Sequence, residues 1–136
     1  MTTTRLSAFS FLVSLCCASL GAPAEAADLT GAWTTDASVC NKVFVKSGAR
    51  VSFAKDAELS GSGFIIDGRE VRGPSATCRI KRTKEDGAVT HMIAACATDI
   101  MLSDVQLSVR SINADEISRI FPNMEGMETK YYRCAM

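Results

Sequence analysis

The N-terminal segment of this sequence constrains the fold most, because it determines how the cysteines are used. A short start with one charge, Arg5, leads into the apolar run Leu6–Leu20, and an Ala-x-Ala pattern follows at Ala24–Ala26. This order of charged, apolar and small residues is typical of a cleavable secretory signal peptide. The apolar run is too short for a permanent transmembrane helix, which needs about 20 residues. We therefore predict cleavage after Ala26, a periplasmic or secreted location, and one exported domain comprising residues 27–136.

Export places the remaining cysteines in an oxidising compartment. Six cysteines are present, and Cys16 and Cys17 leave with the signal. Lipidation is disfavoured, since Leu15 rather than a small residue precedes Cys16. The exported chain keeps Cys40, Cys78, Cys96 and Cys134. An even number of cysteines in a short exported chain predicts a disulfide framework, for which three pairings are possible. Their wide spacing and the single histidine argue against a zinc site, so no metal or cofactor is expected.

Short strand-like runs separated by turn residues dominate the exported part, and helical periodicity is scarce. We expect strands at Leu29–Thr34, Val39–Lys46, Ala49–Ala54, Ala76–Thr83, Ala88–Ala97, Val105–Arg110, Glu116–Phe121 and Thr129–Cys134, with a further hairpin at Phe64–Val71. Pro122–Glu128 is expected to be a polar loop with room for one helical turn. The pattern predicts an all-β fold, a small antiparallel up-and-down barrel or sandwich of about eight strands.

The strand plan favours one disulfide pairing. Counting outward from a turn centred on Gly87 places Cys78 opposite Cys96, both on the inward face of a hairpin. A bridge is feasible there if the Cα atoms lie about 4.4 to 6.8 Å apart. The other pair, Cys40 and Cys134, would then join an early strand to the last one. A different pairing would have the same stabilising role, so the connectivity stays open.

Few residue types in this chain suit catalysis. Ser/His/Asp chemistry would depend on the only histidine, His91, which lies in the middle of a predicted strand. The acidic pairs Glu85-Asp86 and Asp115-Glu116 occupy predicted turns, where Asp is favoured for local backbone hydrogen bonds. We therefore expect no catalytic residues and no enzyme.

Charge and methionine content exclude further classes. Lys and Arg total 15 and Asp and Glu total 15, so there is no basic excess for nucleic acid. The basic residues within Arg79–Lys84 are followed at once by acidic ones and indicate a solvated strand face. Met124 and Met127 have no histidine or free cysteine beside them, which favours packing at a barrel end over copper binding.

The only tryptophan, Trp33, lies early on the first predicted strand, in Gly31-Ala32-Trp33. This segment resembles the Gly-x-Trp opening of lipocalin-like barrels. It also resembles that of the small bacterial inhibitors of secreted metalloproteases, which are compact eight-stranded barrels. In the lipocalin-like family an arginine on the last strand packs over the tryptophan, and the resemblance implies this role for Arg133, with Arg119 as second candidate. Alternatively, Trp33 is simply a core residue that fills one barrel end.

These observations favour a monomeric, exported, non-enzymatic domain that acts by binding an unknown partner. One alternative is a periplasmic protease inhibitor of lipocalin-like barrel type, in which Ala27–Thr30 would insert into a protease cleft. Another is a carrier of a small apolar ligand, because eight-stranded barrels are either filled by side chains or hold one small ligand. The phenylalanines expected to line such an interior are Phe44, Phe53, Phe64 and Phe121.

Overall fold

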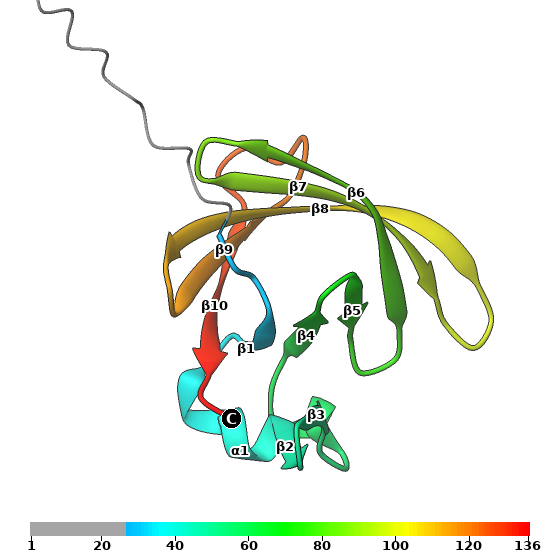
Figure 1. Ribbon diagram of the computed structural model, residues 1–136, viewed down its shortest axis with the longest axis vertical. Coiled ribbons are helices and arrows are strands. Elements are labelled where there is room, and N and C mark those ends of the chain that lie inside the picture. The colour runs from blue at the N-terminus through cyan, green and yellow to red at the C-terminus, as the bar shows by residue number, and fades with distance from the viewer. Residues whose placement is uncertain (1–26) are drawn as a thin grey trace, which may run out of the picture.

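The computed structural model describes residues 27–136, and the predicted export signal lies outside the described residues (Figure 1). Eight antiparallel strands form a closed barrel in the order β1-β10-β9-β8-β7-β6-β5-β4. The barrel strands are β1 (Gly31–Thr34), β4 (Gly63–Asp67), β5 (Glu70–Arg72), β6 (Thr77–Asp86), β7 (Val89–Ala97), β8 (Leu102–Asn113), β9 (Glu116–Ile120) and β10 (Glu128–Cys134). The predicted all-β barrel is confirmed, and the sandwich alternative is wrong because β1 pairs with both β10 and β4.

The segment between β1 and β4 forms an outer layer on the barrel. It contains η1 (Ala37–Val39), α1 (Cys40–Val43), β2 (Phe44–Ser47), β3 (Arg50–Phe53) and α2 (Ala57–Ser60). Buried side chains of this layer pack on the outer face of the barrel, forming one cluster: Val43, Phe44 and Ala57 with Ala32, Ile65 and Cys134. The C-terminus lies beside α1 in Figure 1, close to this layer. Strand β1, most of β4 and the C-terminal end of β10 are therefore buried on both faces, whereas Glu128 and Lys130 at the start of β10 are exposed.

The outer layer differs from the sequence prediction in two places. The strand expected at Val39–Lys46 begins only at Phe44, because the residues before it are helical. The Asp36 carboxylate accepts the backbone N–H of Ser38 at 2.8 Å, which starts the helical turns. The helix α2 was not expected from the sequence. It is a single turn, too short to produce a helical periodicity.

The barrel interior also differs from the sequence prediction. Phe44 and Phe53 lie outside the barrel, where their ring centroids are 5.3 Å apart between β2 and β3. The barrel interior instead contains a separate cluster of buried residues: Leu29, Trp33, Ile66, Val71, Cys78, Ile80, Met92, Ala94, Cys96, Val109, Ile117 and Tyr131. Phe64 is half-buried and packs against this inner cluster. The loop at Pro122–Glu128 contains turns, and no helix is assigned within it.

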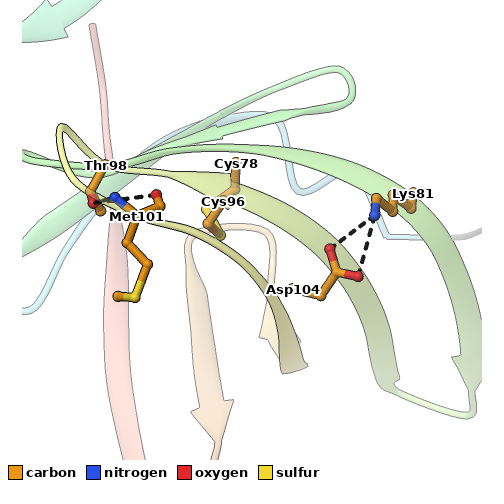
Figure 2. The surroundings of a disulfide bond; sticks show 6 residues. All are labelled: Cys78, Lys81, Cys96, Thr98, Met101 and Asp104. Atoms are coloured by element: carbon orange, nitrogen blue, oxygen red, sulfur yellow. Dashed lines mark hydrogen bonds and ion pairs between the residues drawn. A yellow bond between two sulfur atoms is a disulfide. The ribbon is translucent and has the colours of Figure 1, made fainter.

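Both favoured disulfides are confirmed: Cys40–Cys134 and Cys78–Cys96. The first joins the outer layer to β10. The second crosses between β6 and β7 inside the barrel (Figure 2), with Cα atoms 3.9 Å apart, closer than the expected range. Disulfides of this kind persist in oxidising compartments, so they are compatible with an extracellular or periplasmic protein.

A β-bulge determines which residue lies opposite Cys78. The hairpin turn is at Gly87–Ala88, so the predicted centre at Gly87 is slightly displaced. On the turn side Arg82 lies opposite Ile93, and continuing that register would place Cys78 opposite Ala97. The register shifts by one residue between Ile80 and Arg82, which moves Cys78 onto its disulfide partner. A one-residue shift of this kind moves side chains to the other face, so the bulge keeps the cysteines inside.

Candidate ligand-binding cavity

One end of the barrel is closed around Trp33, which is 0% exposed. The Trp33 Nε1–H donates to the backbone oxygen of Leu29 at 2.9 Å. The Arg133 guanidinium lies over the tryptophan ring, with Cζ 4.3 Å from the ring centroid. Arg119, the second candidate for this position, lies over Phe121 instead. The Gly-x-Trp segment and the last strand therefore meet at this end.

Arg133 is also surrounded by backbone oxygen acceptors. Its Nε and Nη2 donate to Ala114 O and Asp28 O, each at 2.8 Å, and its Nη1 donates to Thr30 O. Gly31 permits this approach, since a Cβ there would lie 2.7 Å from the Arg133 Nη1. Residues 27–30, called the N-terminal segment from here on, are thereby held against the β8–β9 turn. This arrangement seals the barrel end, which we call the Trp33 end.

The interior also contains a cavity of about 280 Å³ that is partly open to solvent. Residues of β4 to β10, of the β5–β6 turn and of the segment just before β4 line it: Ser62, Gly63, Phe64, Ile66, Val71, Gly73, Ala76, Cys78, Met92, Val105, Leu107, Val109, Arg119 and Tyr131. Most of these side chains are apolar. Of the four phenylalanines expected to line the interior, only Phe64 does so. An apolar interior space of this kind suits a small organic molecule.

Arg119 is the only charged side chain among the residues that line this cavity. It lies on β9, where alternation places it on the same face as Ile117, a member of the inner cluster. Its Cζ is 4.7 Å from the Phe121 ring centroid. Within residues 27–136, its guanidinium forms no ion pair or hydrogen bond. Alternation along β9 indicates that Arg119 faces the interior. The strand is short, and its sequence does not show at which end of the barrel the Arg119 side chain lies.

The groups considered for catalysis lie elsewhere. His91 is half-buried on β7, and its Nδ1 is 2.9 Å from the hydroxyl oxygen of Ser108, which is 2% exposed. Within the described part of the chain, no carboxylate forms an ion pair with His91. Met124 and Met127 are both exposed in the β9–β10 loop. The structure therefore brings none of these groups into the cavity.

The perturbed carboxyl groups also lie outside the cavity. The hydroxyl of Ser118 donates to Glu128 at 2.7 Å, and this bond, together with the nearby Arg110, lowers the pKa of Glu128. The backbone N–H of Thr30 donates to Asp28 and lowers the pKa of that carboxyl. Both lowered pKa values follow from structural hydrogen bonds of the barrel, because each bond favours the charged form of its carboxylate.

No protein-family model, curated protein or solved structure matches the chain. Among residues 27–136 there is no cluster of three or more His, Cys, Asp or Glu side chains placed to hold a metal ion. The same residues include no helix that is long and apolar enough to cross a membrane.

Proposed function

We propose that this protein is an exported binding protein that holds one small, largely apolar molecule inside its barrel. The observation that carries the proposal is the partly open cavity of about 280 Å³, lined mainly by apolar side chains. The barrel is closed around Trp33 at the other end, so a ligand would enter from the cavity side. The two disulfides support the same proposal, because they brace an interior that is not completely filled. We propose that the protein binds this ligand as a monomer, in the periplasm or outside the cell.

The cavity volume limits the size of the ligand. An apolar protein cavity of about 150 Å³ holds one benzene molecule. The cavity here, at about 280 Å³, is nearly twice that volume. It lies just below the range of about 300 to 1,000 Å³ that is usual for drug-sized ligands. We therefore expect a ligand such as a hydrocarbon chain of about eight carbons or a small bicyclic molecule.

The alternative of a protease inhibitor has less support. Insertion of Ala27–Thr30 into a protease would require this segment to leave the barrel. Leu29 is buried in the inner cluster, Trp33 donates to its backbone oxygen, and Arg133 donates to the backbone oxygens on either side of it. Detachment would expose apolar surface and leave the Arg133 donors without their acceptors, which costs free energy.

Calorimetric titration with 1-hexanol, 1-octanol and 1-decanol tests the proposed function. We expect one site per chain and a dissociation constant that falls about fourfold with each added methylene, from about 0.8 kcal/mol of burial, until the cavity is full. The variant Val105→Phe places a ring at the cavity wall and should weaken binding of the longer alcohols first, by about tenfold.

Val45→Phe is the matched control, because Val45 is exposed on β2 in the outer layer. Binding of the alcohols to this variant should equal that of the unaltered protein. Absence of saturable binding by every alcohol, or equal effects of the two substitutions, would contradict the proposed function.

A further inference from the structure

We propose that the cavity selects ligands with an anionic end, a carboxylate on a short hydrocarbon chain, and that Arg119 determines this selectivity. The inference rests on the proposed function and names the chemical class of its ligand. Three observations carry it: the position of Arg119, its lack of an acceptor, and a second donor in the same cavity.

Arg119 differs from every other half-buried arginine of the described chain. Four arginines are half-buried within residues 27–136: Arg72, Arg110, Arg119 and Arg133. Arg72 Nε is 3.1 Å from a Glu70 oxygen, and Arg110 Nη1 is 2.6 Å from a Glu128 oxygen. Arg133 has the backbone acceptors described above. Arg119 alone has no oxygen acceptor among the described residues.

The aromatic contact of Arg119 leaves its hydrogen-bond donors unused. The Phe121 ring attracts the cation and holds the side chain at the cavity, but a ring does not replace an oxygen acceptor. A guanidinium has five N–H donors in a planar fork that matches the two oxygens of a carboxylate. The arginine is therefore positioned for an acceptor that has to come from the ligand or from solvent.

Tyr131 supplies a second donor to the same cavity. It lies on β10, where it is opposite Ile117, and Arg119 is opposite Thr129, so the two cavity residues are diagonal neighbours. The Tyr131 ring packs against Phe64 with centroids 4.8 Å apart. Its hydroxyl has no hydrogen-bond partner within the described residues. Because both residues line the same cavity, the Tyr131 hydroxyl is a second candidate donor for a carboxylate bound there.

The apolar walls make the charge of the ligand decisive. A carboxylate leaves water at a large free-energy cost unless it is paired and hydrogen-bonded, and Arg119 provides that pairing. An alcohol of the same length fills the apolar space but offers the arginine a single uncharged acceptor in place of two charged oxygens. A cationic ligand would in addition be repelled. The expected order of affinity is carboxylate, then alcohol, then amine.

Three probes with the same hydrocarbon chain test the inference by calorimetry at neutral pH: sodium octanoate, 1-octanol and octylammonium chloride. For the unaltered exported protein we expect octanoate to bind at least tenfold more tightly than octanol, with octylammonium weakest. In Arg119→Met this preference should vanish, while octanol binds within about threefold of its original affinity.

Arg82→Met is the matched control, because Arg82 is exposed on the outer face of β6 and the substitution changes the net charge equally. It should leave the preference unchanged. Arg119→Lys keeps a point charge without the planar fork and should retain only part of the preference. Tyr131→Phe should weaken octanoate more than octanol.

The outcomes separate the two proposals. Saturable octanol binding with no preference for octanoate would overturn the inference and leave the proposed function intact. A preference that survives in Arg119→Met would also overturn it, as would equal weakening of all three probes, which is the signature of a purely structural arginine. If none of the three probes binds the unaltered protein, the proposed function itself fails. Should Arg119→Met not fold, the order of affinities for the unaltered protein and for Arg119→Lys decides.

Discussion

The two ends of the barrel use the same pair of residue types in different ways. At the Trp33 end an arginine lies over an aromatic ring, with Arg133 Cζ 4.3 Å from the ring centroid of Trp33. At the cavity an arginine also lies over a ring, with Arg119 Cζ 4.7 Å from the centroid of Phe121. The difference lies in the oxygen atoms around each guanidinium. Arg133 donates to three backbone oxygens, whereas Arg119 has no such acceptor within residues 27–136.

The comparison teaches that a cation over a ring does not by itself distinguish a structural arginine from a binding one. Segments distant in sequence, the N-terminal segment and the β8–β9 turn, bring carbonyl groups to Arg133. The cavity residues around Arg119 are mostly apolar, and none of them provides an oxygen acceptor for its guanidinium. Hydrogen bonds to a charged group contribute about 1.5 to 3 kcal/mol, so the acceptors determine how each arginine contributes to stability.

The largest difference in stability is expected from truncating the aromatic ring at each end. Trp33→Ala should lower the free energy of unfolding by about 3 to 5 kcal/mol, because a fully buried ring leaves a cavity. Phe121→Ala should lower the free energy of unfolding by about 1 kcal/mol or less, since Phe121 is only half-buried and lies next to Arg119 at the solvent-accessible cavity. Urea unfolding of both variants measures the contrast. Equal losses would show that the two ends are packed alike.

The arginines themselves should differ by a smaller amount. Arg133→Met should lower the free energy of unfolding by about 2 kcal/mol, because it removes charged hydrogen bonds and leaves backbone oxygens without donors. Arg119→Met should change it by about 0.5 kcal/mol or less, since only a partly exposed contact with Phe121 is lost. The same unfolding assay compares the two. A large loss for Arg119→Met would point to a structural role for that residue as well.

The smallest effect is expected from pH at the Trp33 end. The hydrogen bond from Thr30 and, to a lesser degree, the nearby Arg133 lower the pKa of Asp28 below its ordinary value. The stabilising contribution is therefore complete above the ordinary pKa and is lost as pH falls through the lowered pKa. Asp28→Asn should remove this acid-dependent part of the stability.

Carboxyl titration by NMR checks the direction of the shift. Asp36, whose pKa is lowered by its hydrogen bonds with Ser38, provides an internal reference for the same direction. An Asp28 that titrates at or above its ordinary pKa would contradict the proposed contacts of the N-terminal segment.

Much of the barrel was predictable because its signals are local. Alternation along β7 and the glycine at the Gly87–Ala88 turn, where φ is +58°, indicate a hairpin within a short window. The same hairpin count suggested Cys78–Cys96, although the correct pairing depends on the bulge at Lys81. The residues around Lys81 give no sequence signal for that bulge. The predicted disulfide agrees with the observed one because the displacement of the turn and the bulge shift the register by equal amounts in opposite directions.

The outer layer shows where local signals fail. Val43, Phe44 and Val45 have the β-branched and aromatic composition of a strand, yet α1 ends at Val43 and the strand begins after it. Burial of Val43 against Ala57, and the bond between Cys40 and Cys134, favour the helical turn. These contacts join residues that are far apart in the chain, and tertiary packing of this kind overrides local propensity.

Local sequence patterns were therefore sufficient for the barrel strands, most turns and the all-β class, because each depends on neighbouring residues. Tertiary structure alone decided which phenylalanines face the interior, how much of that interior is filled, and which arginine finds oxygen acceptors. The physical reason is that a hydrogen-bond donor is satisfied by whichever segment folds beside it. For Arg133 that segment comprises Asp28 and Thr30, just before β1, and for Arg119 no described segment takes that place.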